Sequence, residues 1–398
     1  MLRSKNAKMT QREFIVFSAC SMMLTALGID IMLPVFEQVR DAFKLEPGSP
    51  ATALIIVFFF LGQTAQIIFG TLSDRYGRIA VLRTGFVLYI AGGVVATYSP
   101  SLPLMFLFRF IAGVGASAVF MTTIASVRDR FVGDAMAKIM SLIFTIFLFT
   151  PVFAPFLGLA ILSVSSWKMV FLTPPLFGVV VFLWSTRLEE SWSKENRVAW
   201  NFRQIIKSIS IVFENKTFVR YTSITTLLFS GLSTYVANSE RIVSETYGEP
   251  SLFAWIFAAI GLLMSFFALM NSKFAARYGT RRAIKYLLVV YTLISLLLTL
   301  ITLFTGDPPP MLAFFVCVGL LMAINLAIEP NSSALALESL GNIAGTASAV
   351  YGTCFFLVGS VIGLAISYFL SSGLMVMVAS YFLIGVVSLA LILGDRRG

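Results

Sequence analysis

A short charged stretch, GTLSDRYGRIAVLR at residues 70–83, gives the first indication of the fold. The segments on either side of it, residues 51–72 and 79–98, are predominantly apolar. Each is about 20 residues long, which is enough for an α-helix to cross a hydrocarbon core about 30 Å thick. The stretch is therefore typical of a tight turn between two membrane-spanning helices.

Apolar segments of this length recur along the whole chain of 398 residues, of which 58% are hydrophobic and 12% are charged. This composition is typical of a polytopic membrane protein. We predict an all-α membrane protein with twelve transmembrane helices, because the segments are too long and lack the regular turns of a membrane β-barrel. The other ten segments are residues 14–36, 102–126, 137–163, 167–187, 218–238, 252–271, 284–305, 311–331, 344–370 and 373–394.

Basic residues gather in alternate connections between these segments and near both termini. The positive-inside rule therefore predicts that both termini are cytoplasmic. The net charge of +10 then reflects topology and contact with anionic lipid. We expect no nucleic-acid partner, because no soluble domain is predicted that could bind one.

The content of reactive residues excludes several classes of chemistry. The chain has no histidine, so a proton carried within the membrane must be carried by Asp or Glu. Cys20, Cys317 and Cys354 lie inside predicted helices without a CxxC spacing, which favours small buried side chains over a metal site. GxxxxGK[ST], HExxH and GxSxG are absent, so we expect no enzyme, no cofactor and no ATP-driven transport. An ion gradient remains as the energy source.

The longest polar connection, residues 188–217, divides the twelve segments six and six. We predict an N-terminal bundle at 1–187, a cytoplasmic linker at 188–217 and a C-terminal bundle at 218–398. Apolar residues at helical spacing in the linker favour either an amphipathic helix on the membrane surface or a solvated linker. They are Trp200, Ile205, Ile206, Ile209 and Val212.

The tripeptide RYG occurs at residues 75–77 and again at 277–279, each time between the second and third predicted helix of a bundle. This matched position indicates an internal repeat. Parallel repeats of six helices are typical of transporters that move one half against the other around a site at the membrane midplane.

The stretch from Gly70 resembles the loop motif G-x-L-x-D-R-x-G-R-[RK] of the major facilitator superfamily. The motif residues present here are Gly70, Leu72, Asp74, Arg75, Gly77 and Arg78. The glycines allow tight turns, and Asp74 can pair with basic neighbours or with the positive end of another helix. The resemblance implies a cytoplasmic latch. Ordinary positive-inside charge would explain the arginines but neither the acid nor the glycines. The second copy has Ala276 in place of the acid, so we expect a weaker latch there or none.

Further matches are similar to the Bcr/CflA group of bacterial drug:proton antiporters. They are DIMLP at 30–34, FLFRFIAGVGASAV at 106–119, SVRDRF at 126–131 and ALALESLGNIAGTASAVYG from Ala334. The antiporter motif of the fifth helix is present as TPVFAPFLG, with Pro151, Pro155 and Gly158, but Ala154 replaces its glycine. The resemblance implies proton-coupled export across the bacterial inner membrane, with antibiotic resistance as the result.

Asp30 and Arg109 are charged residues inside otherwise apolar segments. At about 1.5 Å per residue, Asp30 lies roughly 9 Å and Arg109 roughly 10 Å below the periplasmic boundary. A charge at the centre of a membrane helix costs about 2.5 to 3.5 kcal/mol, which a pair only partly offsets. We therefore expect Asp30 to accept protons and cations and Arg109 to modulate it, although a fixed ion pair is the alternative.

We expect a substrate cavity lined by aromatic, methionine and amide side chains, which can repack around different ligands. The candidates are Met23, Phe58, Phe59, Gln63, Met121, Tyr235, Asn238, Asn325 and Phe356. Ordinary helix packing explains any one of them equally well, and the two scarce amides Gln63 and Asn325 are the strongest. Glu329 is either a further cation or proton site or an interfacial acid ahead of a helix break at Pro330.

These observations favour a drug/H⁺ antiporter that works as a monomer. An exporter of one endogenous metabolite, such as a siderophore, sugar or amino-acid derivative, is the principal alternative. An inward proton symporter comes next. A sensor or structural membrane protein would need neither the latch motif, nor the intramembrane charges, nor the prolines of the fifth helix.

Overall fold

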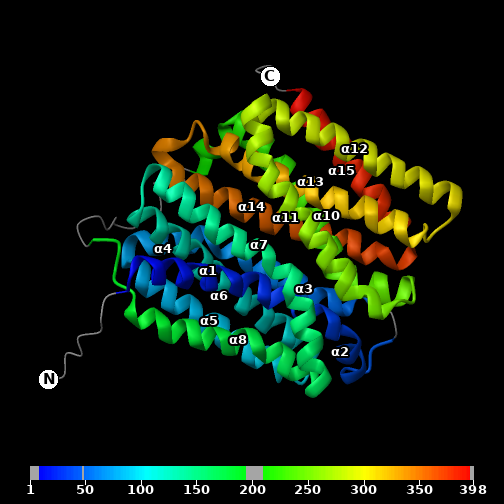
Figure 1. Ribbon diagram of the computed structural model, residues 1–398, viewed down its shortest axis with the longest axis horizontal. Helices are drawn as coiled ribbons and strands as arrows, with labels where there is room; N and C mark the ends of the chain where they lie inside the picture. Colours follow the sequence, from blue (N-terminus) through cyan, green and yellow to red (C-terminus); the bar gives the residue numbers. More distant parts are fainter. Residues whose placement is uncertain (1–8, 47–48, 194–208, 395–398) are drawn as a thin grey trace. The chain divides into compact units, whose positions relative to one another are not determined.

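The computed structural model describes residues 9–46, 49–193 and 209–394, and within these ranges the backbone forms helices and turns but no strand (Figure 1). The predicted all-α fold is confirmed. The α-helices are α1 Gln11–Asp30, α2 Phe36–Ala42, α3 Ala51–Gly62, α4 Gln66–Tyr76, α5 Arg78–Thr97, α6 Leu102–Arg130, α7 Gly133–Val164, α8 Trp167–Trp184, α10 Lys216–Arg241, α11 Phe253–Tyr278, α12 Thr280–Thr305, α13 Met311–Leu337, α14 Ala344–Phe369 and α15 Met375–Leu393.

Among the described residues, 11 helical spans are long and apolar enough to cross a membrane. The predicted segment 218–238 corresponds to α10, which has the required length of 26 residues but is rich in serine and threonine. Several of its hydroxyl groups donate to carbonyl oxygens of the same helix, as in Thr225 to Tyr221 and Thr234 to Ser230, whereas those of Thr222 and Thr226 have no partner among the described residues. Most of these serine and threonine side chains are buried against α13, α14 and α15, so the composition of α10 reflects contact with other helices.

The first predicted helix is interrupted, which the sequence analysis did not anticipate. α1 ends at Asp30, and a 3-10 turn, Leu33–Val35, precedes α2. Pro34 has no N–H group to donate to the carbonyl of Asp30, so α-helical hydrogen bonding cannot continue there. The N–H of Met32 instead donates to Ile29 at 3.3 Å. Asp30 therefore lies at the end of a helix segment rather than in its middle.

The second predicted helix also changes geometry, because a 3-10 turn at Gln63–Ala65 separates α3 from α4. Unlike the break in helix 1, this one has no proline to mark it in the sequence. Short 3-10 segments inside a long helix often mark hinges or sites of function.

The two RYG tripeptides occupy equivalent positions. Gly77 links α4 to α5 with φ 96°, and Gly279 links α11 to α12 with φ 81°. Residues with a side chain rarely adopt a positive φ, so glycine is needed at both turns.

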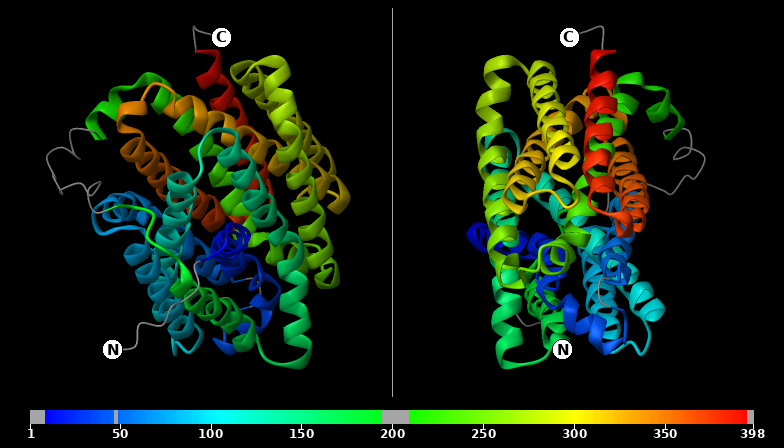
Figure 2. Two further views of the ribbon diagram at one scale, coloured as in Figure 1. Left: turned by 60° about the vertical axis from the view of Figure 1, so that its left-hand side comes forward. Right: turned by 90° about the vertical axis from the view of Figure 1, so that its right-hand side faces the viewer.

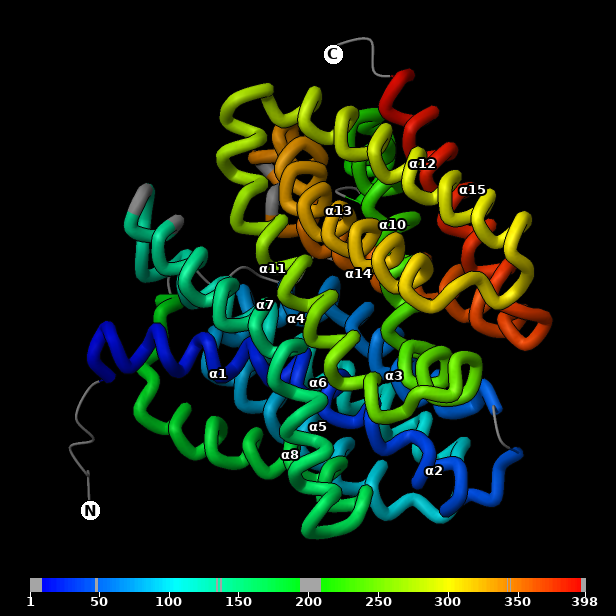
Figure 3. Tube along the Cα trace, turned by 45° about the vertical axis from the view of Figure 1, so that its right-hand side comes forward, coloured from blue at the N-terminus to red at the C-terminus, as the bar shows by residue number. Residues whose placement is uncertain are grey.

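The chain divides into two compact units. Unit 1 comprises Met1–Val35 and Leu61–Phe202. In unit 1, α6 packs against α4 and α5, while α1 packs against α6, α7 and α8. Figure 3 shows α8 beside α5 in this unit. Helix α1 is thus enclosed by the other helices of unit 1.

Unit 2 comprises Phe36–Phe60 and Arg203–Gly398. Its central helix is α10, which packs against α13, α14 and α15. Helices α11 and α12 pack on α13, and Figure 2 shows α12 in yellow beside α15 in red.

The structure describes only part of the predicted linker. Trp200, Ile205 and Ile206 lie outside the described residues. Residues 209–214 are helical, and Val212 is fully buried. The amphipathic helix over the whole linker stays a prediction.

Candidate functional site

Asp30 is the last residue of α1 and is only 5% exposed. Its carboxylate makes no hydrogen bond or ion pair with any of the residues that the structure describes. A carboxylate that is removed from water without a partner is strongly disfavoured in its charged form. Asp30 is therefore a group whose charge depends on what binds beside it.

Arg109 lies on α6 and is 2% exposed. Its Nη2 donates to the carbonyl oxygen of Gly28 at 2.7 Å. The N–H of Met32, the ordinary α-helical donor to that carbonyl, donates to Ile29 at the helix break instead. Arg109 thus satisfies an acceptor that the break in helix 1 leaves open. This bond holds the guanidinium at Gly28, which is two residues before Asp30 in the sequence.

The fifth membrane helix, α7, packs against the break in helix 1. A Cβ atom at Gly158 would lie against the carbonyl oxygen of Ile31, and Pro34 Cγ would be 3.1 Å away. Pro151 and Pro155 are both inside α7, which removes two helical N–H donors on this helix. The antiporter-motif residues therefore belong to the helix that contacts the segment directly after Asp30.

We expect Gly158→Ala to lower stability by about 1–3 kcal/mol, because the added methyl group meets backbone that cannot rotate away. The melting temperature of the purified protein and its transport should both fall. Gly345→Ala is the matched control, since a Cβ there meets nothing within 4 Å. An unchanged melting temperature for Gly158→Ala would show that α7 and helix 1 are not held this closely.

An apolar pocket of about 380 Å³ lies between α1 and α7 in unit 1. Met23 and Leu27 line it from α1, while Phe149, Phe153 and Ala154 do so from α7. The pocket places one predicted cavity residue, Met23, beside the antiporter motif. Ala154, which replaces the motif's glycine, is part of its wall.

The remaining predicted cavity residues of helices 2 and 4 differ in burial. Gln63 is 1% exposed in the 3-10 turn of helix 2, and its Nε2 has no hydrogen-bond partner among the described residues. Phe59 is fully buried, whereas Phe58 and Met121 are partly exposed. A buried amide without a partner is unusual in a folded protein, so Gln63 is the polar group here best placed to bind a ligand or water.

In unit 2, the predicted amides are occupied by bonds within the helix bundle. Asn325 donates to the carbonyl of Leu228 at 2.8 Å, and Asn238 donates to Ser367 Oγ at 2.8 Å. Tyr235 is 2% exposed and stacks on Phe257. Asn238 Oδ1 and Tyr235 Oη nevertheless have no hydrogen-bond partner among the described residues, so these two predicted cavity residues keep a free polar atom.

Glu329 and Phe356 lie near a group of aromatic rings in unit 2. Tyr351 Oη donates to Glu329 Oε1 at 3.2 Å. α13 continues through Pro330 to Leu337, so the helix does not break after Glu329. The carboxylate therefore lies about two turns inside the helix rather than at its end.

The motif residues between α4 and α5 form a compact ionic network within unit 1. Arg78 pairs with Asp74 at 2.7 Å and with Asp129 of α6 at 2.8 Å. The Trp192 ring lies 4.4 Å from the Arg78 guanidinium, and its Nε1 donates to the carbonyl of Asp74 at 2.9 Å. Gly70 and Arg75 belong to α4 and Gly77 to the turn. Asp74 thus pairs with a basic neighbour, which is one of the two arrangements that we expected.

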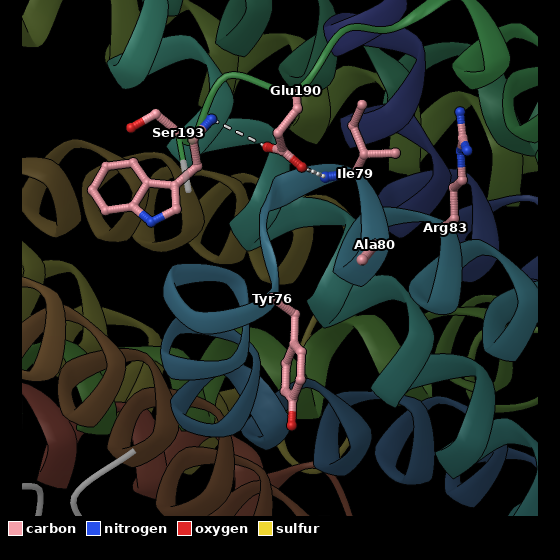
Figure 4. A pocket seen from close by; sticks show the side chains of 7 residues that line it. Tyr76, Ile79, Ala80, Arg83, Glu190 and Ser193 are labelled. Carbon is pink, nitrogen blue, oxygen red and sulfur yellow. Dashed lines mark hydrogen bonds between the residues drawn. The ribbon is translucent and has the colours of Figure 1, made fainter. Parts of the chain in front are cut away.

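Glu190 occupies the N-terminus of α5, which the sequence analysis did not identify. Its carboxylate accepts from the N–H groups of Arg78 at 2.9 Å and Ile79 at 3.2 Å. Figure 4 shows the Glu190 carboxylate beside the N–H of Ile79, at a pocket of about 590 Å³ that Tyr76 and Arg83 also line. The helix dipole favours an acid at this position. The start of the linker is thereby fixed to the α4–α5 turn.

A second ionic cluster, also not identified from the sequence, lies in unit 2. Arg40 of α2 pairs with Glu240 of α10 through two bonds of 2.9 and 3.0 Å, and with Glu245 at 2.9 Å. The side chains of Arg40 and Glu240 are 4% and 5% exposed. The sequence offers one signal for this cluster, which is that Arg40 is among the few basic residues outside the basic connections.

Comparison with known proteins identifies the group to which this architecture belongs. The family described as Major Facilitator Superfamily matches residues 18–364. The chain is 27% identical over 360 residues to a bicyclomycin resistance protein homolog of Haemophilus influenzae, covering 88% of this chain and 87% of the relative. It is 28% identical over 238 residues to the multidrug resistance protein MdtL of Escherichia coli, covering 59% of each.

The same architecture occurs among solved structures. A D-xylose-proton symporter superposes with a TM-score of 0.77 at 13% sequence identity, covering 96% of each chain. At this identity the likeness concerns the fold alone.

Proposed function

Because the chain belongs to the major facilitator superfamily, we propose that it is a proton-coupled efflux transporter that exports small amphipathic or cationic compounds by alternating access. The relatives named for resistance to bicyclomycin and to multiple drugs support export of drugs. The buried carboxylate of Asp30, which has no partner among the described residues, carries the proposal.

Asp30 couples export to the proton gradient by taking a proton or a substrate, but not both. In the state described here the carboxylate has no countercharge, which favours the protonated form. A rearrangement at the break after Asp30 that turns Arg109 from Gly28 toward the carboxylate would favour the charged form and release the proton. A cationic substrate at Asp30 has the same effect. Substrate binding and protonation therefore compete.

The Arg40 cluster fastens the end of helix 1 and the start of helix 2 to α10. A buried ion pair is a poor source of net stability compared with apolar packing, so its role is conformational. We assign it to the closed state of the membrane face opposite the Asp74 turn. The Asp74–Arg78–Asp129 network serves as the latch on the cytoplasmic face.

Charge exchange tests the role of the Arg40 cluster. Arg40→Glu and Glu240→Arg alone should each destabilise the closed state by about 3–5 kcal/mol, because each leaves buried charges unpaired. The double variant should restore part of the export activity, since the exchanged pair is complementary but Glu245, the second partner of Arg40, then lies beside an acid. The control is exchange of Arg281 and Glu338, which are 3.6 Å apart and whose side chains are 24% and 64% exposed. If the single variants and the double variant lose export activity equally, the assignment would be contradicted.

The remaining features follow from the proposed function. The protein is a monomer in the bacterial inner membrane with both termini cytoplasmic, and protons and a small molecule are its only cargo. The bundles at 1–187 and 218–398 alternate the access of the substrate to the two sides of the membrane, with residues 188–217 as the cytoplasmic connection. The cavity set of Met23, Phe58, Phe59, Gln63, Met121, Tyr235, Asn238, Asn325, Phe356 and Glu329 contacts the substrate in one or more states.

A panel of drugs tests the breadth of export. Cells that lack their own pumps should become resistant to several unrelated compounds when they express the protein. If the cells become resistant to none of these compounds but export one metabolite that they make, the dedicated exporter would be favoured. Uptake with proton entry in the same direction would favour a symporter.

A further inference from the structure

Glu329 has one partner among the described residues, the hydroxyl of Tyr351 at 3.2 Å. It lies on α13 and is partly buried, and none of the described ion pairs includes it. The other acid of unit 2 that is fixed inside the bundle, Glu240, has Arg40 as its partner. Glu329 is thus an intramembrane acid whose charge the neighbouring side chains do not balance.

Aromatic rings extend from this acid across α14 and α10. Tyr351 stacks on Phe355 with ring centroids 6.2 Å apart and an interplanar angle of 15°. The ring centroids of Phe355 and Phe229 are 4.2 Å apart, and the ring centroid of Phe356 is 5.1 Å from each of these two. The faces of such rings carry partial negative charge and attract cations that have lost part of their water.

We propose that Glu329 and the rings of Tyr351, Phe355 and Phe356 form a specificity site for the positive charge of lipophilic organic cations. The inference rests on the proposed export function and assigns one substrate class to this site. The carboxylate provides the countercharge, and the partly exposed rings of Phe355 and Phe356 contact the apolar body of the ligand. Tyr351 is a positioning residue, because its hydroxyl orients the carboxylate.

The arrangement explains why an acid is present where an amide would pack equally well. The change Glu329→Gln would keep the hydrogen bond from Tyr351 and nearly the same side-chain volume, so packing does not require the charge. A charged group inside a membrane helix is costly, and a bound cation offsets that cost. Neutral ligands gain nothing from the charge, so the site distinguishes ligands by charge rather than by shape.

Two probes that differ chiefly in charge test the inference on the purified protein. Methyltriphenylphosphonium is a cation, and triphenylphosphine oxide is a neutral molecule with the same three rings. Calorimetry at pH 8 should show that Glu329→Gln binds the cation with an affinity at least about tenfold lower than that of the wild type. The reason is that a charge-assisted contact contributes roughly a factor of ten or more to the affinity. Affinity for the neutral probe should change less than about twofold.

Three further variants complete the experiment. Glu329→Asp keeps the charge and should recover part of the affinity for the cation. Tyr351→Phe should weaken binding of the cation and leave binding of the neutral probe unchanged. Glu338→Gln, an acid-to-amide change at a position whose side chain is 64% exposed, should bind both probes as the wild type does.

Several results would overturn the inference. One is failure of the wild type to bind the cation. Another is that Glu329→Gln and the wild type bind the cation with equal affinity. The third is that Glu329→Gln loses affinity equally for the cation and for the neutral probe. Equal loss would make Glu329 a structural or proton-coupling residue. Because these are binding measurements, they stand apart from the drug panel: absence of export from cells contradicts the proposed function without deciding whether Glu329 selects cations.

Discussion

Replacing Asp30 by asparagine is expected to abolish export driven by a pH gradient, down to the level of cells without the transporter. The amide has nearly the same shape but cannot take up or release a proton, so binding of substrate no longer competes with protonation. Packing at the end of α1 should be preserved, because Asp30 makes no hydrogen bond with the described residues that the change would remove. The measurement is accumulation of a fluorescent substrate inside inverted membrane vesicles, whose lumen corresponds to the periplasmic side, with and without an imposed pH gradient.

Asp41→Asn is the matched control for this experiment. Asp41 lies on α2 and is exposed, so the same acid-to-amide change should leave transport intact. Expression and melting temperature of both variants should equal those of the wild type. Full dependence on the pH gradient in Asp30→Asn would remove Asp30 from the coupling mechanism.

Replacing Arg109 by methionine is expected to cause loss of both transport and stability. The change leaves the carbonyl of Gly28 without its donor at the break in helix 1, which costs about 1–3 kcal/mol. It also removes the guanidinium that we propose turns toward Asp30. Arg109→Lys keeps a positive charge but loses the planar fork, so it should recover stability better than coupling.

Both effects can be measured separately. The melting temperature reports the loss of the bond to Gly28, and gradient-driven transport reports coupling. Arg12→Met changes an exposed arginine on α1 and should alter neither. Normal transport by Arg109→Met would contradict the role of Arg109, whatever its melting temperature.

The architecture could be predicted from the sequence because it depends on features that are repeated along the chain. Apolar segments of membrane length predicted the helices, and the two RYG tripeptides predicted equivalent turns, where Gly77 and Gly279 both have positive φ. α10 was found despite its serines and threonines because of its length and position.

The arrangement of charges could not be predicted in the same way. Depth alone put Asp30 and Arg109 at one level, but the direction of the Arg109 side chain depends on a carbonyl that becomes free only where Pro34 interrupts helix 1. The Arg40–Glu240 pair joins residues 200 positions apart, so no local pattern announces it. The turn at Gln63–Ala65 has no proline and contacts α6, a neighbour that the local sequence does not reveal.

Proton release on substrate binding tests the central claim most directly. Purified protein in a weakly buffered detergent solution, mixed with a compound from the drug panel that binds both proteins, should acidify the solution in the wild type and not in Asp30→Asn. Equal acidification by the two proteins, or none by the wild type although the compound binds, would contradict competition between proton and cargo at Asp30.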